Sequence, residues 1–228
     1  MAKTIDEATD KGSQASEGAA GQPVAADEVR DGPTAGRLRW ADMEKDAVIT
    51  VRCIGCGGLV PQMEGPTHRY VESSPGCWHV FGEVLAREYS DRAFAAWHRL
   101  TVDSYAVQHP GRPSPQSIQS VCVHLISLCL VVERALEPAY ATRVMGTLIR
   151  PKGRFTWLTP PPTFGDITVV DVAAVSTAAA HVKGVRDWAA SAWAAWAHHH
   201  ATVRSWLPKE LSELPNNEYL DSSVKRKR

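Results

Sequence analysis

The sequence lacks the features that direct a chain to a membrane, to secretion or to a nucleic acid. It has no run of about 18 or more uninterrupted apolar residues, which argues against a membrane-spanning helix. Its first residues are acidic and polar, which argues against a secretory signal. Net charge is also absent, because 25 Lys and Arg residues balance 25 Asp and Glu residues. We therefore expect a cytoplasmic protein, and we expect neither a membrane nor a nucleic acid as its partner.

Large apolar side chains are almost missing from residues 1–36, which are rich in Ala, Gly, Ser, Asp and Glu. Such a segment buries too little surface to offset the entropy lost on ordering. We predict a disordered tail at 1–36, a zinc-stabilised helical domain at 37–214 and a flexible basic tail at 215–228. The last four residues are all Lys or Arg, and such an end is usually only solvated, although it could touch a nucleic acid or a partner.

No catalytic motif is complete in this chain. Neither a Glu-x-x-His nor a His-x-x-x-His pair occurs, and these would be the sharper metal signals on helices. The Cys count is odd, at five, which argues against a disulfide framework. The sequence alone therefore names no reaction.

A Cys-x-x-Cys-Gly knuckle is the most informative feature that is present. Cys53 and Cys56 form it, and His68 and Cys77 follow at spacings that a tetrahedral Zn²⁺ site can use. Gly57 permits the left-handed turn that brings backbone amides toward the sulfur atoms. Cys77 follows Ser-Pro-Gly at an expected helix N-terminus, where the dipole favours a thiolate. We predict a closed structural Zn²⁺ site with the ligands Cys53, Cys56, His68 and Cys77.

Other interpretations of the knuckle are weaker. A c-type haem needs His directly after the second Cys, and position 57 is Gly. A thioredoxin-like redox pair needs a helix after the motif, and no helical pattern follows Cys56. Two alternatives stay open at this point: His79 replaces His68 as a ligand, or the thiols are unliganded.

Helical patterns dominate the remaining sequence. Ser114-Pro115 opens a helix that runs to about residue 135 and is apolar nearly all round, so we expect it to be the central buried helix. Asp91 is a good N-cap for the expected helix at 92–108. The expected helices are 76–89, 92–108, 114–135, 138–148 and 178–207, with a short element at 168–175. Strand patterns are confined to 47–52 and 155–158. We predict an all-α fold, a helical bundle with an N-terminal zinc-knuckle loop and little strand.

Several histidines lie on the expected helices. At about 100° per residue, Tyr105 and His109 fall within about 20° of His98 on one helix face. His98 and His109 are about 16 Å apart along that helix, too far to share an ion. His98, His124 and His199 are therefore the candidate catalytic set of a His-lined cavity, which could hold a second metal or supply a general base.

The plainer interpretation of these residues is structural. A His on an apolar face is more often hydrogen-bonded to a backbone carbonyl, and Asp103 lies four residues after Arg99, where the two can pair. Cys122 and Cys129 are expected to be small buried hydrophobes. The four Trp residues of the last helix are expected in the core or at an interface: Trp188, Trp193, Trp196 and Trp206.

Longer motifs in the chain resemble an uncharacterised family of soluble bacterial proteins, known mainly as a domain of unknown function. They are Cys53-Ile-Gly-Cys-Gly57, Gly65-Pro-Thr-His-Arg-Tyr70, Ser74-Pro-Gly-Cys-Trp78, Gly82-Glu-Val-Leu-Ala-Arg-Glu-Tyr89, His98-Arg-Leu-Thr-Val-Asp103 and Tyr105-Ala-Val-Gln-His-Pro-Gly111. The resemblance covers roughly residues 50–207 and supplies no activity. It implies that these residues belong to a family pattern: Cys53, Cys56, His68, Cys77, His98, Asp103, Gln108, His109 and His124. Where the family usually has Pro after the first knuckle Cys, this chain has Ile54.

Two function classes follow from these observations. The first is a non-catalytic regulatory or accessory protein, stabilised by zinc, that binds a protein partner. The second is an enzyme, metal-dependent or His-based, that uses the His-lined cavity on a substrate the sequence does not name. A pocket that joins His98, His124 and His199 would favour the enzyme, and an exposed apolar patch would favour the partner-binding protein.

Overall fold

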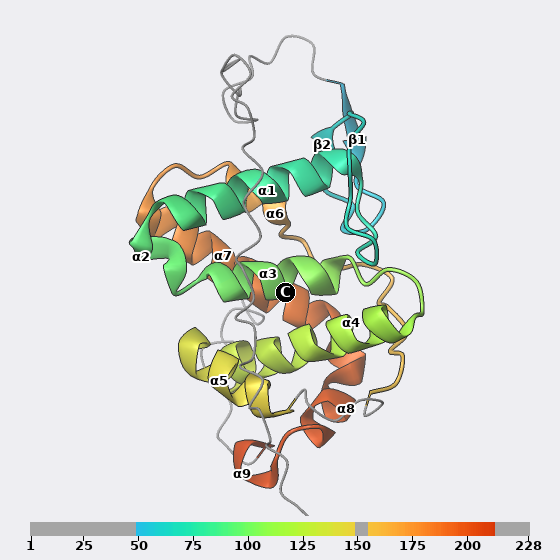
Figure 1. Ribbon diagram of the computed structural model, residues 1–228, viewed down its shortest axis with the longest axis vertical. Helices are drawn as coiled ribbons and strands as arrows, with labels where there is room; N and C mark the ends of the chain where they lie inside the picture. Colours follow the sequence, from blue (N-terminus) through green and yellow to red (C-terminus); the bar gives the residue numbers. More distant parts are fainter. Residues whose placement is uncertain (1–48, 149–154, 213–228) are drawn as a thin grey trace, which may run out of the picture. The chain divides into compact units, whose positions relative to one another are not determined.

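The structure is a computed structural model that describes residues 49–148 and 155–212, so the tails expected at 1–36 and 215–228 lie outside the described residues. Helices dominate it, and the predicted all-α fold is confirmed (Figure 1). In chain order the elements are β1 Thr50–Arg52, β2 Leu59–Pro61, α1 Pro75–Ser90, α2 Arg92–Ala95, α3 His98–Gln108, α4 Pro115–Leu128, the π-helical turn η2 Cys129–Glu133, α5 Pro138–Leu148, α6 Val169–Ala173, α7 Ala178–Ala195, the 3-10 turn η3 Ala197–His199, α8 His200–Ser205 and α9 Lys209–Ser212.

Proline and capping residues set the helix starts. Pro75 and Pro115 stand at the first positions of α1 and α4, where their missing N–H groups cost no helical hydrogen bond. The Ser114 hydroxyl accepts from the Ser117 amide, so α4 is also capped. The Asp91 carboxylate accepts from the Ala93 amide at the start of α2. These starts agree with the sequence-based expectation.

Two expected helices are broken in the structure. The helix predicted at 92–108 is interrupted between α2 and α3, where the Trp97 amide donates to the Phe94 carbonyl at 2.8 Å and closes a tighter turn. The helix predicted at 178–207 ends at residue 195 and resumes as η3 and α8. At that break the indole N–H of Trp196 donates to the carbonyl of Val107 on α3. A buried tertiary contact therefore takes precedence over the continuous apolar pattern.

The strands form a single small hairpin. β1 pairs antiparallel with β2, with Val51 opposite Val60. The expected strand at 47–52 is present as β1, whereas β2 was not predicted because it is only three residues long and ends in Pro61. The strand expected at 155–158 is not formed.

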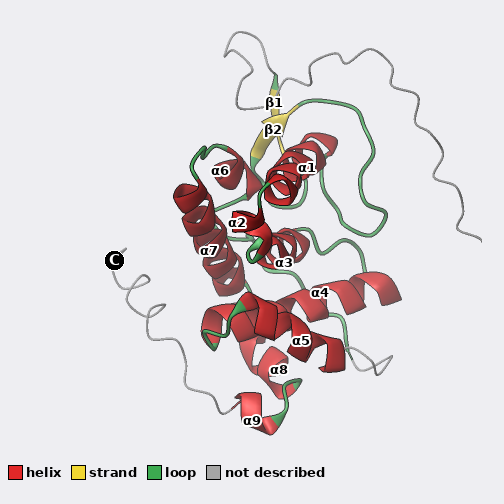
Figure 2. Ribbon diagram, turned by 60° about the vertical axis from the view of Figure 1, so that its left-hand side comes forward, coloured by secondary structure: helices red, strands yellow, loops and turns green. Residues whose placement is uncertain are grey.

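The helix at the centre of the bundle is α3, which packs against both α4 and α7 (Figures 1 and 2). A separate contact joins α6 to α1. In the described part of the chain, Pro115–Glu133 is the one segment long and apolar enough to cross a membrane. It is a core helix in this fold, because Leu125, Ile126 and Leu130 on it are fully buried. Trp188, Trp193, Trp196 and Trp206 are also buried, as the core interpretation requires.

The first turn of α1 lies close against the hairpin. A Cβ atom added at Gly76 would overlap the backbone carbonyl of Pro61, whereas one added at Gly82, on the same helix, would meet nothing within 4 Å. Only glycine therefore lets α1 approach β2 so closely, and this approach brings Cys77 toward the knuckle.

We expect Gly76→Ala to lower the free energy of unfolding by about 2 kcal/mol or more, because a backbone atom stands where the methyl group must go. Gly82→Ala is the matched control and should raise stability by up to about 1 kcal/mol through helix propensity. Urea unfolding of both variants measures this. Equal effects of the two substitutions would contradict the close approach.

Candidate metal centre

Three sulfur atoms and one imidazole nitrogen meet beneath the hairpin. Cys53, Cys56, Cys77 and His109 each offer one ligand atom, and these atoms all lie within 4.8 Å of one another. The His109 Nε2 atom is 3.5 Å from both Cys53 Sγ and Cys77 Sγ, and Cys56 Sγ is 3.9 Å from Cys77 Sγ. All four residues are buried. This is the only group of three or more such donors among residues 49–148 and 155–212.

The knuckle loop is shaped by its own backbone. The Cys53 amide donates to the Gly58 carbonyl at 2.8 Å, and the Gly57 amide donates to the Cys53 carbonyl at 3.0 Å. Gly57 has a φ of 76°, the left-handed conformation that its place in the sequence predicted. Cys53 follows β1 directly and Cys56 lies in the turn, so the hairpin carries both side chains to one point.

The other two donors come from helix ends. Cys77 lies in the first turn of α1, and His109 is the residue that follows α3. The His109 Nδ1 atom is 2.7 Å from the Tyr105 carbonyl, one turn back, so it carries the proton and donates. In the neutral ring Nε2 then carries the free lone pair, and this atom faces the sulfur atoms.

The outer contacts favour thiolates at this centre. The Ser74 amide donates to Cys53 Sγ at 3.4 Å, and the Tyr105 hydroxyl donates to Cys77 Sγ at 3.7 Å. Burial and the neighbouring Cys77 raise the pKa of Tyr105, so it stays a donor. Such donors to the ligand atoms are a regular part of metal–thiolate sites.

The distances fit a tetrahedral ion. Zn–S bonds of about 2.3 Å and Zn–N bonds of about 2.0–2.1 Å, at tetrahedral angles, place two sulfurs about 3.8 Å apart and a sulfur and a nitrogen about 3.5 Å apart. The observed separations are 3.9 Å and 3.5 Å. The sulfurs are also too far apart for a disulfide, and all five cysteines are free.

The pKa values of two thiols in the cluster are shifted in opposite directions. Hydrogen bonds from Cys56 and Cys77 lower the pKa of Cys53, while hydrogen bonding to Cys53 and Cys56, with burial, raises the pKa of Cys77. Against the opposing effect of burial, hydrogen bonds with Cys53 and Cys56 raise the pKa of His109 to about 9. The Cys53 thiol therefore loses its proton more readily than the Cys77 thiol does. Cys122 and Cys129 differ, because burial raises the pKa of each to about 12, and they are inert core residues as expected.

His68 is not among the grouped donors, which corrects the predicted ligand set. Its ring lies 4.3 Å from that of Tyr70 and 5.6 Å from that of Trp78, in an aromatic group beside the centre. His79, the substitute ligand, pairs instead with Glu83 at 3.6 Å. His109 takes the place expected for His68. The sequence held one signal for it, since His109 shares a helix face with Tyr105 and belongs to the same motif.

One comparison with known proteins gives a match. The model of a family of unknown function, DUF5946, matches residues 51–197. The chain belongs to the DUF5946 family. The matched region contains all four donors of the cluster, so the candidate metal centre lies inside the family domain. Neither the curated proteins nor the solved structures contain a match.

The predicted set of His98, His124 and His199 does not come together in this DUF5946 domain. His98 Nδ1 bonds Glu88 Oε2 at 2.9 Å, and His124 Nδ1 bonds Asp103 Oδ1 at 2.6 Å. His199 Nε2 donates to the Thr159 carbonyl. Each imidazole therefore has its own partner on a different element, as the structural interpretation holds. The Arg99–Asp103 pair expected from the sequence is present at 2.9 Å.

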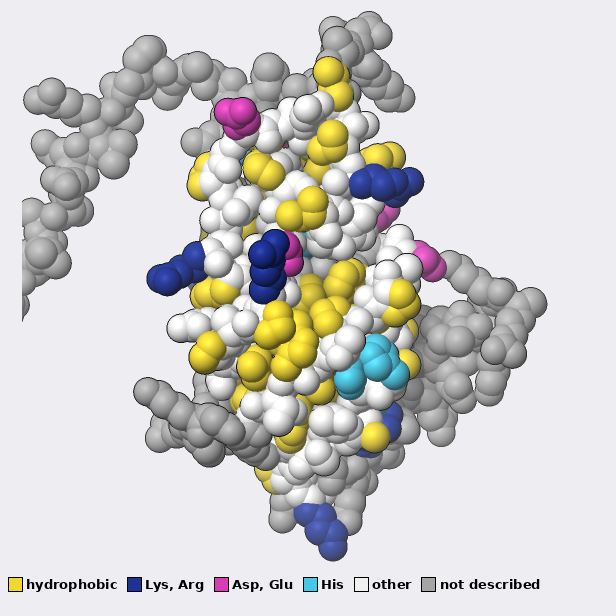
Figure 3. Space-filling view, turned by 90° about the vertical axis from the view of Figure 1, so that its right-hand side faces the viewer, with side chains coloured by type: hydrophobic (Ala, Val, Ile, Leu, Met, Phe, Trp, Pro, Cys, Tyr) yellow, Lys and Arg dark blue, Asp and Glu magenta, His cyan; other side chains and the backbone are white. Residues whose placement is uncertain are grey.

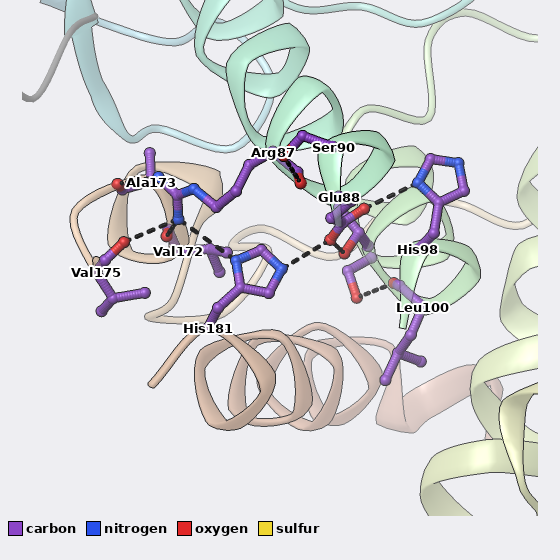
Figure 4. Close-up of polar contacts among 11 residues, drawn as sticks. Arg87, Glu88, Ser90, His98, Leu100, Val172, Ala173, Val175 and His181 are labelled. Atoms are coloured by element: carbon purple, nitrogen blue, oxygen red, sulfur yellow. Dashed lines mark hydrogen bonds and ion pairs between the residues drawn. The ribbon is translucent and has the colours of Figure 1, made fainter. Parts of the chain in front are cut away.

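Glu88 is the hub of a polar network that sequence analysis missed (Figure 4). Its fully buried carboxylate accepts from Thr101 Oγ1 at 2.5 Å, His181 Nε2 at 2.9 Å and His98 Nδ1 at 2.9 Å. His98 Nε2 in turn lies 2.9 Å from the Tyr89 hydroxyl. The network joins α1, α3 and α7. No local pattern points to it, because the three partners lie 10, 13 and 93 residues away.

Arg87 completes this network on the other side. It donates to the carbonyls of Val172, Ala173 and Val175 at the end of α6, and its Nη1 atom lies 3.4 Å from His181 Nδ1. These bonds satisfy carbonyls that the helix leaves open. Figure 4 shows His181 pointing between Arg87 and Glu88. The histidine bridges a cation and a carboxylate inside the core.

The metal-ligand assignment predicts that His109→Ala lowers the bound Zn²⁺ of purified protein well below one ion per chain, because only three donors remain. His68→Ala is the matched control and should retain full occupancy. Elemental analysis of both variants, with Co²⁺ absorption as a reading of tetrahedral thiolate coordination, makes the comparison. Loss of metal from His68→Ala alone would overturn the assignment.

The Glu88 network makes a separate prediction about stability. Glu88→Ala leaves two buried donors, on Thr101 and His181, and the part-buried His98 without their acceptor, and should cost about 3 kcal/mol or more. Tyr89→Phe removes only an exposed hydroxyl from the same network and should cost less than about 0.5 kcal/mol. Thermal unfolding of the two variants measures both, and a mild effect of Glu88→Ala would show that the carboxylate is dispensable.

Proposed function

We propose that this DUF5946 protein binds one Zn²⁺ as a structural metal through Cys53, Cys56, Cys77 and His109. We further propose that it acts in the bacterial cytoplasm as a non-catalytic accessory protein that binds a protein partner. The observation that carries the proposal is the set of four buried donors at tetrahedral separations.

Zinc suits this donor set better than other ions do. Three thiolates and an imidazole form one of the regular closed structural zinc sites. Mg²⁺ and Ca²⁺ prefer oxygen donors, and no carboxylate belongs to the group. Four protein donors fill the tetrahedral coordination sphere of the ion and leave no position for a substrate. The metal therefore has a structural role.

The metal would join segments that are far apart in the sequence. Cys53 and Cys56 belong to the hairpin, Cys77 to α1, and His109 to the end of α3. The strands of the hairpin are only three residues long, so the hairpin has few backbone hydrogen bonds of its own. Binding energy at such a site is folding energy for the segments it joins.

The partner-binding part of the proposal has a separate support. Ile49, Leu59 and Ile54 are 69%, 52% and 70% exposed, and all three lie on the hairpin or the knuckle. Large apolar side chains exposed on one short segment are candidate contacts for a protein partner. The metal would hold this surface in shape, which gives a structural zinc a use beyond stability.

Removal of the metal should lower stability clearly. We expect a strong chelator to reduce the melting temperature by roughly 10 °C or more, because metal binding contributes several kcal/mol to folding. Re-addition of Zn²⁺ should restore it, and Mg²⁺, as the control, should not. An unchanged melting temperature after verified metal loss would contradict the structural role.

The partner surface is tested by exchange of its apolar side chains. A double variant with Ile49→Ser and Leu59→Ser should no longer capture a partner from cell extract, while its zinc content stays at one ion per chain. Tyr140→Ser, which changes an exposed residue on α5 (45% exposed), is the control and should capture as the unchanged protein does. Equal capture by both variants would remove the hairpin from the interface.

A further inference from the structure

A pocket of about 350 Å³ lies next to the metal centre, on the side where the loop between α3 and α4 projects. Its size is at the lower end of the range for small-molecule sites, roughly 300–1,000 Å³. Three separate segments line it: the knuckle through Ile54, residues 67–73, and residues 111–117. The pocket contains none of the four metal donors, so it is a distinct site.

The metal centre positions each wall of this pocket. Ile54 directly follows Cys53, and its amide donates to the Ser74 hydroxyl at 3.0 Å, while the Ser74 amide donates to Cys53 Sγ. Gly111 lies two residues after His109, with a φ of 67°, and a Cβ there would contact the Tyr70 carbonyl at 2.6 Å. The three segments therefore lie together because the metal donors near them in the chain lie together.

The lining has the chemistry of an anion site. Arg69 and Arg112 come from different segments and bring two guanidinium groups to the rim. The only acidic side chain in the lining is Glu72, whose Oε1 lies 3.7 Å from Arg112 Nε, so the lining carries a net charge of +1. The Arg112 side chain is 89% exposed, so an anion can reach its guanidinium group from solvent and compete with Glu72 for it.

Hydroxyl groups add neutral donors to the two arginines. Thr67, Ser114 and Ser117 all line the pocket, and the last two hydroxyls lie 2.9 Å apart. A tetrahedral phosphate offers more acceptor atoms than a carboxylate does and matches the fork of arginine. The pocket also has an apolar portion, formed by Ile54, Val71 and Pro113. Figure 3 shows this side of the molecule, where charged side chains are few and lie among apolar ones.

We propose that this pocket binds a small organic phosphate, with its phosphate group held by Arg69 and Arg112 and its organic part against Ile54 and Pro113. The site deepens the proposed function, on which it rests, because the metal holds its walls together. A partner-binding protein with such a pocket would bind its partner and a small phosphorylated ligand on neighbouring surfaces. The ligand would occupy the face that carries Ile54.

Phenyl phosphate is the probe that tests this proposal, with phenol as its counterpart without the anion and benzoate as its carboxylate counterpart. Titrations of the zinc-loaded full chain are followed by amide chemical shifts. We expect phenyl phosphate to shift pocket amides such as that of Gly111, and inorganic phosphate to compete with it. Arg69→Ala and Arg112→Ala should each weaken binding about tenfold or more, because each removes a charge-assisted hydrogen bond. The exposed Arg92→Ala on α2 is the control and should leave binding unchanged.

Different experimental outcomes contradict different parts of the proposal. Binding of phenol as tight as that of phenyl phosphate, or equal weakening by Arg92→Ala, overturns the anion site. Benzoate binding as tight as phenyl phosphate overturns the phosphate assignment. Zinc content is measured in every sample: zinc-loaded protein that does not bind the probe overturns this inference and leaves the metal proposal standing. Probe binding by protein that holds no metal keeps the pocket and overturns the role of the metal.

Discussion

Three buried thiol groups packed against one imidazole set the constraint that brings the hairpin, the start of α1 and the end of α3 together. Cys53, Cys56, Cys77 and His109 come from a hairpin and two helices, and their ligand atoms lie at the separations of a tetrahedral ion. Sulfurs buried side by side hold back each other's ionisation, and a cation among them would favour all three thiolates. The proposed Zn²⁺ would supply that charge and fix where the hairpin, α1 and the end of α3 meet. The pocket lined by Ile54, residues 67–73 and residues 111–117 lies beside this junction.

The helical core has its own polar anchors, independent of the metal. The Glu88 carboxylate connects α1, α3 and α7, and the Asp103 carboxylate connects α3 with α4 through His124 and Ser127, with Ser127 Oγ at 2.5 Å. Buried carboxylates with several donors each are costly to break and fix the relative rotation of the helices. Two of the histidines considered for catalysis, His98 and His124, are used in this way, while His199 donates to the Thr159 carbonyl. This explains why they lie on helices without forming a common cavity.

Local chemistry made much of the fold predictable. The Ser-Pro starts of α1 and α4 follow from residues adjacent in sequence, as does the left-handed Gly57 in the knuckle. The breaks near Trp97 and Trp196 were not predictable, since the apolar pattern continues through them and only a tertiary contact, such as that of Trp196 with Val107, replaces the helix. The strand β2 is too short to leave a periodic signal.

The candidate site was predictable only in part for the same reason. Three donors lie in or near the knuckle pattern, so spacing found Cys53, Cys56 and Cys77. The fourth, His109, lies 32 residues beyond Cys77, and its one local signal, a helix face shared with Tyr105, does not mark it as a ligand in preference to His68. What distinguishes them is the Tyr105 carbonyl that orients the His109 ring, a contact that needs the C-terminal end of α3 in place.

X-ray absorption at the zinc edge of the purified full chain tests the central claim most directly. The account predicts three sulfur neighbours at about 2.3 Å and one nitrogen at about 2.0–2.1 Å, with the outer-shell scattering of an imidazole. A first coordination shell of oxygen and nitrogen alone, or one with fewer than three sulfurs, would contradict it.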